Sequence, residues 1–172
     1  MGDDGALIDI GDGRDLVLTT DTLVSGTHFL STDDPFSIGY KSVAVNLSDL
    51  AAMGAIPKYV LLSLTLPVSD EIWIEQFSNG IKALLRSHSV ALVGGDTTRG
   101  DTLSVTLTAI GFVKSDTALR RDHACLDDDV WVSGLIGLGS IGLLIKQGVL
   151  AFPVEEEQDF LRRLHEPQPR IE

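Results

Sequence analysis

Residues 34–55 read DPFSIGYKSVAVNLSDLAAMGA, and this stretch decides the fold class. Asp34 followed by Pro35 is a helix start, with the aspartate as N-cap and the proline at the first helical position. Apolar residues then recur mostly three or four positions apart, at Ile38, Val43, Leu47, Leu50 and Ala51. Gly54 and Pro57 end the pattern. We therefore predict an amphipathic helix that packs on a core.

Strands and helices are predicted to alternate along the rest of the chain. Stretches rich in β-formers predict strands at residues 15–20, 58–66, 90–93 and 102–113, with a further strand at 130–133. A second helix opens at Ser69-Asp70-Glu71 with a 3.6-residue apolar stripe. A glycine-rich turn over residues 134–142 leads into a helix that ends near Gly148, and residues 155–164 form a last helix. This order predicts an α/β (α+β) fold.

Composition excludes several classes of protein. The net charge is −12 and the sequence pI is about 4.5, and no basic stripe is present, so nucleic acid is not a predicted partner. Cys125 is the single cysteine, which rules out an intramolecular disulfide. No secretory signal and no apolar run of about 18 residues occurs, so we expect no membrane insertion and a cytoplasmic protein.

Four aspartates stand beside glycine, small hydroxyl residues or apolar runs, namely Asp4, Asp21, Asp49 and Asp96. Asp49 lies within the apolar pattern of the predicted helix, where a lone carboxylate needs a cation, hydrogen bonds or a proton. We therefore hypothesise a shared divalent metal cluster and phosphate chemistry, because Mg²⁺ is commonly held by carboxylates and substrate phosphates. Taken alone, Asp4, Asp21 and Asp96 also fit turn residues, and Asp49 also fits a lone aspartate on the solvated side of its helix.

Glycine, hydroxyl and basic residues supply further candidates. The motif GGDTTRG at residues 94–100 would let backbone N–H groups approach a ligand, or it is a tight turn capped by Asp96. It is no Walker A loop, since the chain lacks G-x-x-x-x-G-K-[ST]. Thr19 and Thr20 precede Asp21 at the end of the predicted strand. Lys41, Arg99, Arg120 and Arg121 could each bind phosphate, although a solvated charge is the commoner role.

Taken together and in order, GDDGA, LTTDTLVSGTHF, IGYKSVAVNLSDLAAMGA, SLTLP, LVGGDTTRG and VSGLIG resemble the thiamine-monophosphate kinase family. That family belongs to the aminoimidazole ribonucleotide synthetase-like superfamily. The resemblance runs from Gly2 to the PQPR segment near residue 170, and DLAAMGA and GGDTTRG are its specific pieces. It implies ATP-dependent phosphorylation of thiamine monophosphate to thiamine diphosphate, by direct in-line transfer that needs no side-chain nucleophile or base.

The resemblance also implies roles for individual residues. Several Mg²⁺ ions would be bound by Asp4, Thr19, Thr20, Asp21, Asp49 and Asp96. Gly95 and Asp96 would contact the nucleotide phosphates, and Arg121 would contact ATP. His28, which taken alone would be a surface histidine or one with its hydrogen bonds satisfied, would contact the thiamine phosphate. Lys41 is a further phosphate contact that we infer from its place on the helix and not from the resemblance.

The resemblance further implies a mixed sheet with helices packed on one face and homodimer formation through that sheet. We expect an ATP- and metal-binding domain over residues 1–128 and the start of a second domain over 129–172, so that this chain is part of a longer protein with little kinase activity by itself. Two alternatives remain. One is another ATP-dependent synthetase of the superfamily, of the aminoimidazole ribonucleotide, selenophosphate or formylglycinamidine type. The other is a non-catalytic metal-binding domain.

Overall fold

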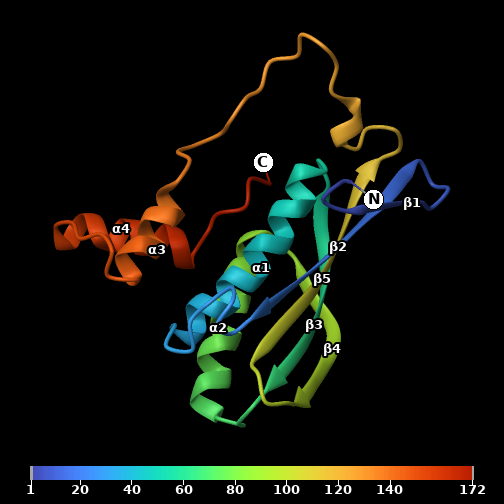
Figure 1. The fold of residues 1–172 in the computed structure, drawn as a ribbon. Helices are drawn as coiled ribbons and strands as arrows, with labels where there is room; N and C mark the ends of the chain where they lie inside the picture. Colours follow the sequence, from blue (N-terminus) through green and yellow to red (C-terminus); the bar gives the residue numbers. More distant parts are fainter. Residues whose placement is uncertain (1, 172) are drawn as a thin grey trace.

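The computed structural model describes residues 2–171, and its centre is one mixed sheet of five strands (Figure 1). The strand order is β1-β2-β5-β3-β4, with β3 and β4 parallel and the other pairs antiparallel. In chain order the elements are β1 (Ala6–Asp9), β2 (Arg14–Val24), α1 (Pro35–Ala52), β3 (Ile56–Leu66), α2 (Glu71–Ser87), β4 (Ala91–Arg99), β5 (Ser104–Lys114), the 3₁₀ turn η1 (Arg121–His123), α3 (Leu138–Lys146) and α4 (Val154–His165). The predicted mixed α/β class is confirmed.

Helices α1 and α2 begin where the sequence predicts. Asp34 caps α1, because its carboxylate accepts a hydrogen bond from the Ser37 amide at 2.9 Å. Asp70 caps α2 by accepting from the amides of Ile72 and Trp73. Such side-chain caps satisfy backbone N–H groups that have no partner inside the helix.

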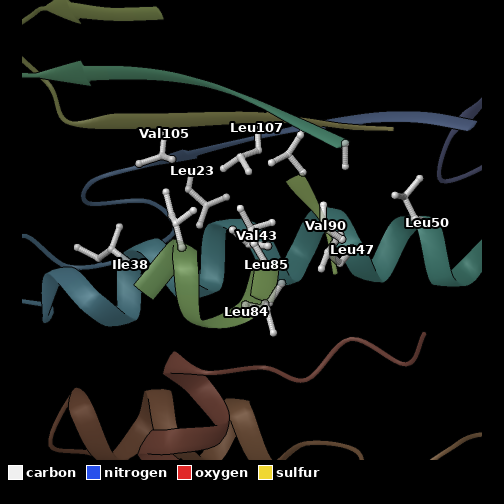
Figure 2. Packing of buried hydrophobic residues seen from close by; sticks show 14 of the residues in the cluster. Leu23, Ile38, Val43, Leu47, Leu50, Leu84, Leu85, Val90, Val105 and Leu107 are labelled. Carbon is white, nitrogen blue, oxygen red and sulfur yellow. The ribbon is translucent and has the colours of Figure 1, made fainter. Parts of the chain in front are cut away.

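Both helices cover the same face of the sheet and form the core with it (Figure 2). Val43 and Leu47 of α1 are fully buried against Val105 and Leu107 of β5, and α2 adds Leu85. Burying a side chain of this size contributes about 1.5–3 kcal/mol relative to leaving it exposed. The apolar stripes predicted for the two helices therefore supply most of the residues that the helices bury in this core.

The opposite face of the sheet is open. On the neighbouring strands β2 and β5 it carries paired hydroxyl residues, and the Oγ1 atoms of Thr22 and Thr106 are 2.8 Å apart. On β3 the exposed residues include Tyr59 and Leu61. Dimer formation through this face stays a prediction.

The strand predicted at residues 130–133 is absent from the described chain, and that prediction was wrong. Val130 and Trp131 are 94% and 87% exposed, and the segment arches away from the sheet (Figure 1). A β-strand needs a neighbour for its backbone N–H and C=O groups, and this segment has no such neighbour within residues 2–171. Apolar, β-branched composition alone therefore misled the prediction.

A short, buried strand was predicted at residues 90–93, and this prediction was wrong in both the extent and the burial of the strand. β4 runs through the glycines to Arg99 and pairs with β3 along this length. It is the edge strand of the sheet, and all nine of its residues are exposed. The motif GGDTTRG therefore lies mostly within a strand and not in a turn.

Helices α3 and α4 form an antiparallel pair beside α1, away from the sheet (Figure 1). Their presence is confirmed, and α4 carries glutamates in its first turn and arginines in its last, the order that suits the helix dipole. No helix within residues 2–171 has the length and apolar character needed to cross a bilayer. The domain boundary at residues 128 and 129 stays a prediction.

Candidate functional site

The candidate site lies at the C-terminal end of α1, where Asp49 meets strand β2. The Thr19 hydroxyl donates a hydrogen bond of 2.7 Å to Asp49 Oδ2, and Thr19 is almost fully buried. No basic residue occupies the last turn of α1. A carboxylate at this end of a helix faces the negative pole of the helix dipole, so its charge is not offset by the helix itself.

Asp21 is brought to the same place by a buried asparagine. Asn46, one turn before Asp49, accepts a hydrogen bond from the Asp21 amide at 3.1 Å and donates from its side chain to the Ser42 carbonyl. Asn46 has no exposed surface. These bonds hold the middle of β2 at a fixed distance from α1, and odd-numbered residues of β2 face the helix.

Asp4 and Arg121 approach from the two loops at this end. The Arg121 guanidinium forms an ion pair with Asp4, and the Arg121 amide donates to Asp3 at 2.8 Å. The Leu119 amide donates to the Met53 carbonyl just after α1. The segment after β5 is thereby fastened to both the N-terminal loop and the end of α1.

The pKa of Asp49 is changed by its burial and by the charged groups that surround it. Burial raises the pKa of Asp49 above its usual range, and the Thr19 hydrogen bond opposes that change. The negative charges of Asp21 and Asp4 raise the pKa further, whereas Arg121 lowers it. Three of the predicted metal-binding aspartates therefore act on one another at this end of the molecule.

Thr20 and Asp96 lie on the other side of the sheet. The Thr20 hydroxyl donates to the Leu107 carbonyl at 3.0 Å, and its neighbour across the strands is Thr108. Asp96 pairs in register with Ser63, next to Leu64, which is buried against the helices. Since successive side chains of a strand alternate between faces, Asp96 points to the open face. Within one chain these two residues are not part of the group around Asp49.

Gly95 is required by packing inside the sheet. A Cβ atom at Gly95 would lie 1.8 Å from the Leu62 carbonyl oxygen on β3. The close approach that the sequence suggested for a ligand is thus made here by the neighbouring strand. Its role in contacting a nucleotide stays a prediction.

His28 and Lys41 form a second group near the other end of α1. The Val24 amide donates to His28 Nδ1 at 3.0 Å, and Lys41 Nζ donates to the His28 carbonyl oxygen at 3.1 Å. Burial lowers the pKa of Lys41, while Asp33 nearby raises it. The structure thus brings Lys41 to the His28 loop and not to Asp49.

As a metal centre, the group around Asp49 fits in part. Its donors are carboxylates and a hydroxyl, the hard oxygen ligands that suit Mg²⁺. Within the described residues 2–171, however, no three carboxylate, histidine or cysteine side chains are close enough to hold an ion in this conformation. Asp4 is turned to Arg121 instead. An added cation would compete with that ion pair and relieve the repulsion at Asp49.

Sequence reasoning missed Asn46 and Asp3 as parts of this site. Asn46 could have been found, because it is a polar residue on the buried face of the predicted helix, one turn from Asp49. Asp3 gave no comparable signal, since its contact with Arg121 joins residues 118 positions apart.

These features define an α/β domain with one helix-covered sheet face, one open face and an acidic end. The model of the family described as AIR synthase related protein, N-terminal domain, matches residues 2–113. The chain belongs to this family. The resemblance drawn from the sequence motifs is confirmed at this level.

Named relatives match the whole chain. The thiamine-monophosphate kinase of Escherichia coli strain K12 is 47% identical over 172 residues, which are 99% of this chain and 53% of that protein. That of Haemophilus influenzae is 47% identical over 174 residues, covering 100% and 52%. The chain therefore spans about half the length of the curated relatives it matches.

Solved structures agree in fold. The crystal structure of thiamine-monophosphate kinase from Stenotrophomonas maltophilia K279a superposes with a TM-score of 0.88 at 48% identity, covering 99% of this chain and 55% of that one. A structure described as AaThiL complexed with AMPPCP and TMP gives a TM-score of 0.92 at 32% identity, with coverage of 99% and 55%.

Proposed function

We propose that the protein containing this chain is a thiamine-monophosphate kinase that transfers the γ-phosphoryl group of ATP to thiamine monophosphate. The observation that carries the proposal is the half-buried Asp49, surrounded by Asp4, Asp21 and Thr19 at an acidic helix end. The similarity of the whole chain to enzymes of that name supports it. The ligands of the related complex, AMPPCP and TMP, match the two proposed substrates.

Several Mg²⁺ ions are proposed at the acidic end. Asp4, Asp21 and Asp49 would hold them with Thr19, and Asp96 and Thr20 complete the proposed set. When bound, Mg²⁺ supplies positive charge that offsets repulsion between two anionic substrates. Arg121 would leave Asp4 for the nucleotide, because a guanidinium binds phosphate oxygens in the same bidentate way as carboxylates.

The residues of the chain mainly position the reactants. The attacking phosphate oxygen of thiamine monophosphate is already ionised, so no residue has to remove a proton from it. Holding two reactants in line accounts for much of the rate in such transfers. Thr19 and Asn46 are suited to this role, since their hydrogen bonds fix Asp49 and the backbone of Asp21.

We also propose that the protein is a homodimer through the open sheet face. Asp96 is on that face, opposite the side that Asp49 occupies, so a single chain does not unite them. Exposed Tyr59 and Leu61, together with the threonine pairs of β2 and β5, give that face a mixed apolar and hydroxyl surface.

The test is phosphoryl transfer by the intact protein that contains this chain. Labelled ATP is supplied with thiamine monophosphate or with acceptors of the related synthetases, and thiamine diphosphate is measured. We expect Asp49→Asn to lower the rate more than about 100-fold, since even residues behind the metal ligands account for 10–100-fold. Asp9→Asn is the matched control, because Asp9 is an exposed hairpin residue whose side chain accepts a hydrogen bond from the nearby Gly11 amide.

Three results would count against the proposal. The first is an intact protein that forms no thiamine diphosphate while another acceptor is phosphorylated. The second is an Asp49→Asn variant as active as Asp9→Asn. The third is a melting temperature that rises with Mg²⁺ alone and no further with an ATP analogue, which is expected of a structural metal site. For the 172-residue chain alone we expect little or no turnover.

A further inference from the structure

A largely buried ion pair joins the α3–α4 pair to the loop before α1. Lys146 at the end of α3 contacts Asp33 through Nζ and Oδ1, with side chains 20% and 6% exposed. These residues are 113 positions apart in the chain. Burying two charges is expensive unless further hydrogen bonds satisfy them. Both partners of this pair have such bonds.

His165 provides the further bond for the lysine. Lys146 Nζ lies 3.2 Å from His165 Nε2, which comes from the last turn of α4. An ammonium group has no lone pair, so the lysine is the donor and the neutral imidazole the acceptor. Burial lowers the pKa of His165, and the charge of Lys146 lowers it further, which agrees with a neutral ring.

Asp33 in turn fixes the loop that carries His28. Its second oxygen, Oδ2, accepts from the Leu30 amide at 3.0 Å. Lys41 of α1 fixes the same loop through its bond to the His28 carbonyl. We name Asp33, Lys146 and His165 the interhelix bridge. The bridge thus holds this loop at Leu30, and Lys41 holds it at His28.

The His28 ring is held in one tautomer. A backbone amide can only donate, so the Val24 amide makes His28 Nδ1 an acceptor. In the neutral ring the proton then resides on Nε2, which is left as a hydrogen-bond donor. His28, Lys41 and Lys146 line a cavity of about 240 Å³ between the loop and α3. His28 therefore lines a space that a ligand can enter, and Nε2 carries the proton of its neutral ring.

We propose that Lys41 and the interhelix bridge are positioning residues, which hold His28 as an Nε2–H donor for a polar or anionic group of the acceptor substrate. The assignment of a substrate to His28 rests on the proposed function, whereas the fixed tautomer does not. The bridge acts on the substrate through His28 and the loop. Because Lys146 also lines the cavity, the tautomer of His28 is the readout that separates positioning from direct contact. Its loss should weaken substrate binding and leave the chemical step at Asp49 nearly unchanged.

The experiment uses Lys146→Met in the intact protein, with Lys82→Met as the control. Lys82 is an exposed lysine on α2, outside the bridge. The first readout is the tautomer of His28, from two-dimensional NMR of ¹⁵N-labelled histidine rings. We expect one Nε2–H tautomer in the parent and in Lys82→Met, and averaged tautomers in Lys146→Met. The second is steady-state kinetics with thiamine monophosphate, where we expect KM to rise about 10-fold and kcat to change less than about 3-fold.

Two further variants keep the proposal open to refutation. Lys146→Arg should restore both readouts, since it retains a charged donor toward Asp33. Asp33→Asn, with circular dichroism to verify folding, replaces Lys146→Met if that variant does not fold. An unchanged His28 tautomer together with an unchanged KM in the bridge variant would overturn the proposal. If the parent protein neither binds nor phosphorylates thiamine monophosphate, the proposed function fails, and the NMR comparison still decides whether the bridge positions His28.

Discussion

The two helix pairs of this molecule cross in the same way and are stabilised very differently. In α1–α2, a Cβ atom at Gly80 would lie 2.0 Å from the Phe36 carbonyl oxygen. In α3–α4, a Cβ atom at Gly142 would lie 2.4 Å from the Phe160 carbonyl oxygen. Each crossing thus brings two backbones into direct contact at a glycine, where no side chain fits.

The difference lies in what surrounds each crossing. α1 and α2 carry aspartate caps and bury a row of apolar residues on the sheet (Figure 2). Neither α3 nor α4 has a side-chain N-cap bond, and Gly142 is the buried residue of these two fully described helices. A tight helix crossing is therefore not a core by itself. The first pair is stabilised by the sheet, and the second by its own contacts and the interhelix bridge.

The largest change in the free energy of unfolding is expected from Gly80→Ala, which tests the α1–α2 crossing. The new methyl must displace the backbone of α1, and overpacking of this kind lowers the free energy of unfolding by about 1–3 kcal/mol. We expect the upper part of that range, because the contact is with backbone rather than a flexible side chain. Urea unfolding of the chain, followed by circular dichroism, measures the change.

Asn79→Ala is the control for this substitution, since Asn79 is the exposed neighbour of Gly80 on α2. It should leave the urea midpoint within the range of ordinary surface changes, about 0.5 kcal/mol. Equal midpoints for the two variants would mean that the α1–α2 crossing is softer than the structure indicates.

A smaller and local effect is expected from Gly142→Ala in the second pair. The same overpacking should lower the local free energy of unfolding of α3 and α4 by about 1–2 kcal/mol, while the sheet and α1–α2 keep their stability. Hydrogen exchange resolved by segment measures this: faster exchange over residues 138–165 and unchanged exchange in β2, β3 and β5.

Gly139→Ala, in the same helix, provides a matched control. Its Cβ would meet the Arg163 carbonyl oxygen at an ordinary 3.7 Å, so the helix-propensity gain of up to about 1 kcal/mol should dominate and slow exchange in α3. If Gly142→Ala instead destabilised the sheet as much as Gly80→Ala, the distinction between the two pairs would fail.

Sequence alone predicted the parts of this fold that local patterns determine. The Asp34-Pro35 start, the stripe through Leu47 and the Asp70 start all follow from the first turn of a helix and its apolar spacing. Local patterns did not predict the extent of β4, and they did not predict that the segment around Trp131 lies apart from the sheet. Whether a stretch becomes a paired strand depends on which strand lies beside it, and that is a non-local property.

The residues of the candidate site likewise fall into two groups: those that a local sequence pattern predicts and those that depend on contacts between distant segments. An aspartate inside an apolar helix pattern pointed to Asp49, because an uncompensated charge there is costly. That Thr19 faces Asp49 while Thr20 faces away follows from the strand alternation once β2 is placed over α1. The face of Asp96 depends on its register with Ser63, and the interhelix bridge on contacts between distant segments. No local pattern encodes either.

The smallest expected effect is a change in melting temperature when Asp49 is replaced, which measures how its charge affects the stability of the fold. Its raised pKa means that, above the ordinary carboxyl range, the folded chain binds more protons at this residue than the unfolded chain does. The free energy of unfolding then falls as pH rises through that interval, and the ionised Asp49 destabilises the metal-free protein at neutral pH. Asp49→Asn should therefore raise the melting temperature at pH 7 without metal. We expect about 1–2 °C, which corresponds to about 0.5 kcal/mol at a site open enough for solvent to screen charge.

The pH dependence separates this effect from a general gain in packing. The melting-temperature advantage of Asp49→Asn over the parent should shrink as pH falls and Asp49 becomes protonated, whereas Asp9→Asn should show no comparable trend. Added Mg²⁺ should reverse the order, because a bound cation stabilises the parent carboxylate and gives the amide little. An Asp49→Asn variant that is less stable than the parent at neutral pH without metal would mean that Thr19 and Arg121 more than offset the repulsion at this helix end. The contacts of Asp49 within the chain would then stabilise its charge, and a bound cation would not be required for that purpose.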